Sequence, residues 1–376
     1  MQFRDLEKQY QVLKKDIDMA VLKVLNEANF ISGRQVKQLE ESLANYVGVK
    51  HCITCANGTD ALLLALMACG IKQGDCVFVP DFTFFASAEV VSAVGAIPVF
   101  VDVDKDTFNI STQSLEKAIE VVLKENKLNP KVIITVDLFG QPANYPEIKK
   151  IAEKYNLLIL EDGAQGFGGK IGDKKACSFG DVSTTSFFPA KPLGCYGDGG
   201  AIFTDNTEIA ELIRSLAVHG KGSDKYDNIR IGMNSRLDTI QAAILEVKLE
   251  AFKNYELDRV NHVANLYSEK LKDIVKTPYV IDEFYSSWAQ YTIQLENKQK
   301  RDDLQKFLKN NNIPSMIYYS KPMHLQKAFE TNKNNIVDLS VTEKLCDIVI
   351  SLPMHPYMTE DEIVSIVSVL DKYFNI

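Results

Sequence analysis

Residues 157–165 read Leu-Leu-Ile-Leu-Glu-Asp-Gly-Ala-Gln. The apolar run predicts a strand that is buried on both faces of a parallel sheet. Asp162 follows this run, and ligands of such sheets bind at the carboxyl ends of the strands. Burying a carboxylate is costly unless a cation pairs with it. Asp162 is therefore either a ligand contact or the N-cap of the next helix.

Short apolar runs and helical patterns alternate around this stretch, from residue 50 to about residue 205. The alternation predicts an α/β fold with a mostly parallel sheet of seven strands, flanked by helices. The expected strands are 51–55, 76–80, 97–103, 131–136, 157–160, 182–187 and 201–204. The expected helices are 60–69, 87–94, 114–123, 145–155 and 207–219.

The C-terminal third has a different character. Residues 236–272 form a long, charged and periodic stretch that predicts a helix bridging to a second domain. A strand at 291–295 and helices at 301–310 and 359–373 follow it. We therefore expect a large α/β domain with an N-terminal helical segment over residues 1–250, and a smaller α+β domain over residues 251–376.

The composition is that of an ordinary soluble globular protein. Of the 376 residues, 46% are hydrophobic and 24% are charged, and the formal net charge is −8. An acidic chain without clustered Lys and Arg is not expected to bind nucleic acid.

The N-terminal stretch lacks the apolar segment of a signal peptide, and no run approaches the ~20 apolar residues that span a bilayer. We therefore expect a cytoplasmic protein that does not contact a membrane.

The cysteines do not form the pattern of a metal site. They number seven and are scattered, which is typical of a reduced protein. Cys52 and Cys55 form a lone Cys-x-x-Cys, but Cys69 and Cys76 do not have the spacing of the second pair that zinc needs. A buried strand accounts better for residues 51–55, and we expect no metal.

Lys191 lies between an expected strand and a glycine-rich turn. Residues 185–194 read Thr-Ser-Phe-Phe-Pro-Ala-Lys-Pro-Leu-Gly, so aromatic residues and prolines surround the amine. Partial desolvation lowers the pKa of a lysine and favours its nucleophilic neutral form. Ser186 lies on the same stretch and offers a hydroxyl to a phosphate.

Residues 56–61, Ala-Asn-Gly-Thr-Asp-Ala, form a small polar turn between an expected strand and an apolar helix. The free N–H groups and the positive dipole end of a helix start make a site for a phosphate. An ordinary N-cap by Asn57 or Thr59 is the alternative. The motifs of dinucleotide sites, P-loops and zinc hydrolases have no match in this chain.

Together these elements fit pyridoxal 5'-phosphate (PLP). This cofactor needs a lysine to bond to, an acid at its ring nitrogen and donors for its phosphate. Lys191, Asp162 and the turn at residues 57–60 with Ser186 supply the three.

The chain resembles the DegT-type sugar-nucleotide aminotransferases, which have the aspartate-aminotransferase fold of PLP-dependent enzymes, fold type I. The similarity extends over nearly the whole chain, from residues 29–33 to residues 351–356. Its most specific motifs are residues 57–59, 74–75, 80–84, 161–165, 186 with 191, and 232–236.

The resemblance implies a role for each matching residue. Lys191 would bond to the cofactor and move the proton, and Asp162 would pair with the pyridine nitrogen. Asn234 would reach the cofactor phosphate of the neighbouring subunit, which implies a homodimer with shared active sites. The other implied contacts are Gln165 at the phenolic oxygen, Phe84 on the ring, and Gly58, Thr59 and Ser186 at the phosphate.

The resemblance is greatest to the branch that aminates C3 of a 3-oxo nucleotide sugar. It implies L-glutamate as donor and UDP-2-acetamido-2-deoxy-3-oxo-glucuronate as acceptor, for the synthesis of a surface polysaccharide such as lipopolysaccharide. A dTDP-3-oxo-6-deoxyhexose or a 4-oxo sugar is an alternative acceptor, and a non-catalytic sensor of PLP or of a sugar nucleotide is an alternative function. Lys191 argues against the dehydratase branch, which carries His there.

The expected substrate contacts are less specific than the cofactor contacts. Family members often have a His-Tyr pair before a second His, whereas this chain has Tyr318 and Tyr319 before His324. The candidate cations for a diphosphate or a carboxylate are Arg230, Arg236, Lys221 and Lys321.

Overall fold

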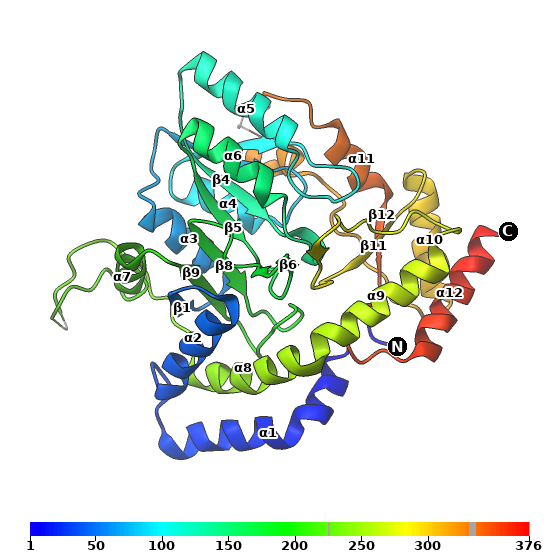
Figure 1. Cartoon of the computed structure of the whole chain (residues 1–376), viewed down its shortest axis with the longest axis horizontal. Helices are drawn as coiled ribbons and strands as arrows, with labels where there is room; N and C mark the ends of the chain where they lie inside the picture. The colour runs from blue at the N-terminus through cyan, green and yellow to red at the C-terminus, as the bar shows by residue number, and fades with distance from the viewer. Residues whose placement is uncertain (225, 331–335, 376) are drawn as a thin grey trace.

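A seven-stranded sheet forms the centre of the structure, a computed structural model that describes residues 1–224, 226–330 and 336–375 (Figure 1). The strand order is β1-β9-β8-β5-β4-β2-β3, and only β9 is antiparallel to its neighbours. The predicted strands are confirmed, with ends that differ by one or two residues. Their bounds are β1 His51–Cys55, β2 Asp75–Pro80, β3 Ile97–Val101, β4 Asn129–Val136, β5 Leu158–Asp162, β8 Val182–Ser186 and β9 Gly200–Thr204.

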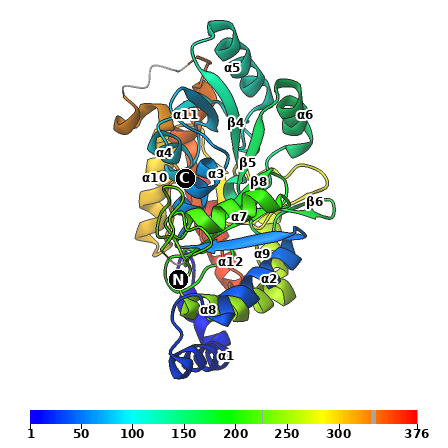
Figure 2. The same cartoon turned by 90° about the vertical axis from the view of Figure 1, so that its left-hand side faces the viewer.

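Helices cover both faces of this sheet, as a largely parallel sheet requires (Figure 2). One face packs against α3 (Gly58–Ala68), α4 (Ala86–Ala93) and α7 (Thr207–Leu216). The other face packs against α5 (Thr112–Glu125) and α6 (Tyr145–Tyr155). The two hydrophobic clusters keep water from the middle strands, so a polar side chain at a strand end needs a protein partner or a ligand.

The predicted bridge to the C-terminal part is confirmed as a continuous helical path. It consists of α8 (Thr239–Ala251), a π-helical turn (Phe252–Glu256) and α9 (Leu257–Leu271). The N-terminal helix α1 (Leu6–Glu27) packs along α8 (Figure 1), and α2 (Arg34–Val47) packs on α8 and β1.

The C-terminal part is a mixed α+β unit with its own hydrophobic cluster. A small antiparallel sheet joins β6, β7 and β10, at the side of the central sheet. The strands of this small sheet are β6 Lys170–Ile171, β7 Lys174–Lys175 and β10 Phe284–Tyr285. In the C-terminal part, β11 (Tyr291–Gln294) pairs with β12 (Val349–Leu352). Its helices are α10 Lys298–Asn310, α11 Ser340–Ile348 and α12 Glu360–Phe374.

One segment of this unit packs on the large domain instead. Met323, Phe329 and Leu345 belong to the cluster of α3 and α4. The predicted division into domains at residues 250 and 251 stays a prediction. Part of the chain after residue 251 packs on the large domain, so the two hydrophobic cores do not divide at that point alone.

The expected strand at the lone Cys-x-x-Cys is confirmed, because Cys52 and Cys55 are both buried in β1. Among the described residues, no helix has the length and apolar character needed to cross a membrane.

Candidate functional site

A cavity of about 700 Å³ opens at the carboxyl ends of the parallel strands. The loops that follow β1, β2, β5 and β8 meet there, which is the position expected for a ligand of such a sheet. The predicted site residues that line it are Gly58, Thr59, Phe84, Asp162, Gln165, Ser186, Lys191, Tyr318 and Tyr319.

Asp162 is the last residue of β5 and is only 5% exposed. Ser87 Oγ donates a hydrogen bond to its Oδ2 at 2.7 Å, and Ala164 N donates to its Oδ1 at 3.2 Å. Burial raises the pKa of this carboxyl, while the Ser87 hydrogen bond and Lys191 oppose the rise. Asp162 does not cap a helix, because a turn follows it. A cation bound in the cavity would relieve the cost of burying it.

Lys191 faces Asp162 across the cavity from the loop between β8 and β9. Burial lowers the pKa of its amine, Asp162 opposes this, and the charge of Arg4 adds to it. The Arg4 guanidinium donates to the backbone oxygen of Lys191 at 2.7 Å, which fixes the base of the loop. The amine therefore has the partly neutral character that a nucleophile and proton carrier needs.

The turn at the start of α3 packs directly against Ser186. Asn57 is the N-cap, because its side chain accepts from Asp60 N at 2.8 Å. The N–H groups of Gly58 and Thr59 begin the helix, and first-turn N–H groups have no partner within a helix. This turn therefore combines a cap with free donors beside a hydroxyl, which is the chemistry of a phosphate site.

Gly58 is expected to tolerate no side chain. A Cβ there would lie 2.7 Å from Ser186 Cβ, well inside a normal carbon contact. Overpacking of this kind costs about 1–3 kcal/mol, so Gly58→Ala should raise the dissociation constant for PLP about tenfold or more. Titrating the apoprotein with PLP by absorbance measures this.

Gly172→Ala is the matched control for this substitution. Position 172 has a φ of +56°, which strains an alanine. The added Cβ would meet nothing within 4 Å, and the residue lies outside the cavity lining. The same rise in dissociation constant in both variants would mean that lost stability, not the clash with Ser186, weakens binding.

Aromatic rings form the other wall of the cavity. Phe84, which is 54% exposed, lies with its ring centroid 6.4 Å from that of Tyr319. The Tyr319 hydroxyl accepts a hydrogen bond from Gln165 Nε2 at 3.0 Å. Gln165 Oε1 accepts from Phe139 N at 2.8 Å, so the amide is held from both ends. The wall offers an apolar surface for a flat ring and one fixed amide at its edge.

The remaining predicted residues lie outside the cavity lining. Arg236 donates to the exposed Asn234 at 2.6 Å, and Arg230 donates to Ser215 on the same surface. Lys221 and Lys321 are exposed.

His324 is 6% exposed at its side chain and bonds to Asp81 and Glu343 instead of facing the cavity. This subunit's own cavity therefore lacks the predicted cations and Asn234.

Sequence reasoning missed three groups of polar residues around the site. Ser87 bonds to Asp162 from the buried face of α4, and Arg4 bonds to the lysine loop from a distant part of the sequence. Only the fold brings them there. The third group is Asp137 with Glu161, which are fully buried behind Asp162. The available signal for this pair was an acidic residue within one apolar strand, Glu161 in β5, and another directly after β4, Asp137.

Glu161 and Asp137 differ in their hydrogen bonds. Glu161 accepts from Ser183 Oγ and from three backbone N–H groups. Asp137 Oδ1 accepts from Ala143 N and Tyr145 OH, whereas Oδ2 is buried and has no hydrogen-bond partner among the described residues. Burial, and then the charge of Glu161, raise the pKa of Asp137 well above its ordinary value. Because Glu161 has four donors and Asp137 Oδ2 has none, we expect Asp137 to carry the proton of this pair.

This asymmetry predicts unequal effects of two similar substitutions. Asp137→Asn keeps an acceptor for Ala143 N and Tyr145 OH, removes the acid where Oδ2 has no partner, and should change the free energy of unfolding little. Glu161→Gln turns an amide N–H₂ towards buried donors and should cost about 1–3 kcal/mol. Urea unfolding of both variants measures the difference. Equal losses, or a larger loss for Asp137→Asn, would contradict the assigned protonation.

The chain is similar over nearly its whole length to known aminotransferases. It is 44% identical to the UDP-2-acetamido-2-deoxy-3-oxo-D-glucuronate aminotransferase of Pseudomonas aeruginosa, over 95% of this chain and 96% of that protein. A solved DegT DnrJ EryC1 StrS aminotransferase from Brucella abortus has a TM-score of 0.97 and 49% identity, with 100% of both chains covered. NtdA of Bacillus subtilis, solved with bound cofactor PMP, has a TM-score of 0.89 and 27% identity, covering 100% of this chain and 85% of that one.

The sequence profile of the DegT/DnrJ/EryC1/StrS aminotransferase family matches residues 11–371, and the chain belongs to this family.

Proposed function

We propose that this aminotransferase uses PLP to move the amino group of L-glutamate to C3 of UDP-2-acetamido-2-deoxy-3-oxo-glucuronate. The observation that carries the proposal is the meeting of Lys191, Asp162 and the turn at Gly58 in one cavity. The acceptor is taken from the Pseudomonas aeruginosa relative, which is similar over nearly the full length of both chains.

The residues of the cavity fit PLP in three respects. Asp162 is a buried carboxylate whose pKa burial raises, and a protonated ring nitrogen would supply a cation beside it. Gly58 leaves no room for a side chain between the first turn of α3 and Ser186, so the donors of both would converge on one phosphate. Lys191 has a lowered pKa, as an amine that must attack a carbonyl requires.

Each residue then has a distinct task. PLP supplies an electron sink for the carbanion that forms when an amino acid loses its α-proton. Asp162 would hold the proton at the ring nitrogen, which that sink requires. The Lys191 amine would take the proton from glutamate and return a proton to the sugar carbon. Phe84 and Tyr319 would offer the apolar surface for the ring, with Gln165, held by Tyr319, at its edge.

We also propose a homodimer with shared active sites. Residues 226–236 lie in a surface loop on which Ile229 and Ile231 are exposed, Ile231 to 88%. Arg230, Asn234 and Arg236 lie on the same loop, outside this subunit's own cavity. If a second subunit buried the isoleucines, the two arginines and Asn234 of this subunit would lie beside the cavity of that second subunit. There they would meet the phosphate groups of its bound cofactor and substrate.

Two experiments test the proposal. Adding L-glutamate to the purified enzyme with PLP should change the cofactor absorbance and release 2-oxoglutarate. Running the reaction in reverse, with 2-oxoglutarate and a panel of UDP- and dTDP-linked 3-amino and 4-amino sugars, should select the UDP-linked 3-amino uronate. Selection of a dTDP sugar would favour the alternative acceptor, and no response to glutamate would favour a sensor.

A further inference from the structure

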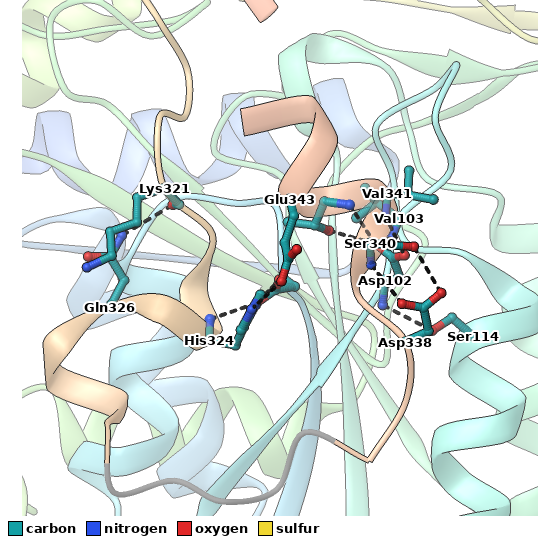
Figure 3. A network of polar contacts seen from close by, with 12 residues as sticks. Asp102, Val103, Ser114, Lys321, His324, Gln326, Asp338, Ser340, Val341 and Glu343 are labelled. Carbon is teal, nitrogen blue, oxygen red and sulfur yellow. Dashed lines mark hydrogen bonds and ion pairs between the residues drawn. The ribbon is translucent and has the colours of Figure 1, made fainter. Parts of the chain in front are cut away.

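His324 joins two segments that border the cavity, through a carboxylate at each ring nitrogen. Its Nδ1 lies 2.6 Å from Asp81 Oδ2. Its Nε2 lies 3.2 Å from Glu343 Oε1 (Figure 3). Its backbone N–H also donates to Asp81 Oδ1 at 2.8 Å. Asp81 is fully buried in the loop after β2, and Glu343 lies on α11.

These contacts define the protonation of the ring. A carboxylate oxygen only accepts hydrogen bonds, so a nitrogen that bonds to it must carry a hydrogen. Both ring nitrogens of His324 meet carboxylates, and the ring is therefore an imidazolium. The hydrogen bond to Asp81 raises the pKa of His324, while burial opposes the rise. Burial raises the pKa of Asp81, and the hydrogen bonds from His324 oppose that.

The contacts connect residues that line the cavity. Asp81 is close in sequence to Phe84, and His324 is close to Tyr319. Met323 N donates to the Asp81 backbone oxygen at 3.0 Å, which reinforces the same junction. The ring of Tyr319 contacts Phe84 and also Phe82, with centroids 6.0 Å apart in the second pair. The ion pair therefore lies where the two aromatic sides of the cavity meet.

Glu343 is held in place by a separate network at the start of α11 (Figure 3). The Asp102 carboxylate accepts from Val341 N at 3.1 Å, from Thr342 N at 2.9 Å and from Thr342 Oγ1 at 2.8 Å. An anionic group at a helix N-terminus is favourable. Asp102 thus fixes the helix from which Glu343 reaches His324.

We propose that the His324 imidazolium is a positioning residue that holds Tyr319 against Phe84, and that loss of its proton loosens this wall of the cavity. The link to the reaction rests on the proposed function, whereas the protonation of the ring does not. The titratable groups around the ring are Asp81, Asp102, Glu343 and Cys346. None of them lines the cavity.

The sign of the pH dependence follows from the raised pKa of His324. The contribution of the ion pair is complete below the pKa of an unfolded histidine and is lost as pH rises through the higher pKa of the folded protein. The glutamate half-reaction should therefore decline on the basic side of this pKa.

The test is an NMR titration of the five histidines in the full-length protein, with and without PLP. His324→Gln identifies the His324 signal by its absence. Wild-type His324 should titrate above the ordinary value of about 6.5. Glu343→Gln should lower the His324 pKa by about 0.2–0.7 units, the range for an exposed ion pair. The same variant should move the basic limb of the glutamate half-reaction to lower pH by a similar amount.

Glu360→Gln is the matched control, because Glu360 pairs with the exposed His262 at 3.6 Å, outside the cavity lining. It should leave the His324 pKa and the glutamate half-reaction unchanged. Titration of His324 at or below the ordinary value would overturn the protonation, even if no cofactor binds. If His324→Gln raised only KM for the nucleotide sugar, and left the glutamate half-reaction and its pH profile unchanged, His324 would be a substrate contact and the positioning role would be wrong.

Discussion

Replacing Lys191 by alanine should lower the rate of amino transfer by about 10⁴-fold, the upper end for the loss of a general acid–base. The effect should be large because, in the proposed function, one amine bonds to the cofactor and also carries the proton in both half-reactions. The substitution removes a partly buried amine whose pKa burial already lowers, so the fold should be preserved. Bound PLP should remain, held by the phosphate turn and by Asp162.

Borohydride reduction followed by peptide mass spectrometry measures the covalent bond directly. In the wild-type protein the mass of the reduced cofactor should appear on the peptide that contains Lys191, and in Lys191→Ala it should appear nowhere. Lys149→Ala is the control, because burial also lowers the pKa of Lys149, yet this residue lies on α6 outside the cavity lining. Labelling of another lysine in the wild type would refute the assignment.

Replacing Asp162 by asparagine should lower the rate by about 10²–10³-fold, as the loss of one fixed electrostatic partner does in other enzymes. An amide cannot keep a proton on the ring nitrogen. It can still accept the hydrogen bond of Ser87. Because burial raises the pKa of Asp162, a neutral residue removes a desolvation cost, and the apoprotein should be at least as stable as the wild type.

This combination of a lost rate and a maintained stability distinguishes a functional carboxylate from a structural one. Urea unfolding of the apoprotein and single-turnover rates with glutamate measure the two quantities. Ser87→Ala is the graded control, since it removes one hydrogen bond and leaves the charge, and its rate should fall less. A destabilised Asp162→Asn apoprotein with an unaffected rate would show that the carboxylate serves only the fold.

Much of the sheet was predictable because several of its strands are almost purely apolar. Runs such as residues 131–136 and 157–160 bury both faces, and the helices between them leave little choice of topology. Asp162, Lys191 and the turn at Gly58 were identified for a related reason, since each is a polar or glycine-rich break at the end of such a run. The structure places all three in one cavity.

The partners of these residues were not predictable in the same way. Ser87 and Arg4 are ordinary polar residues in their own segments, and their importance comes from contacts across more than 70 positions of sequence for Ser87 and more than 180 for Arg4. The contacts of His324 were not predictable for a similar reason. The family resemblance suggested a substrate contact, which stays a prediction, whereas in this structure Asp81 and Glu343 lie at the two ring nitrogens.

The most direct test of the amino-transfer function follows the nitrogen itself. The purified protein with PLP, L-[15N]glutamate and UDP-2-acetamido-2-deoxy-3-oxo-glucuronate is incubated, and the nucleotide sugars are analysed by mass spectrometry. We expect one 15N in a UDP-linked amino sugar, with NMR placing it at C3, and an equal amount of 2-oxoglutarate. Glutamate consumption with 15N found only in ammonia, or a sugar product that contains no 15N, would contradict the function proposed here.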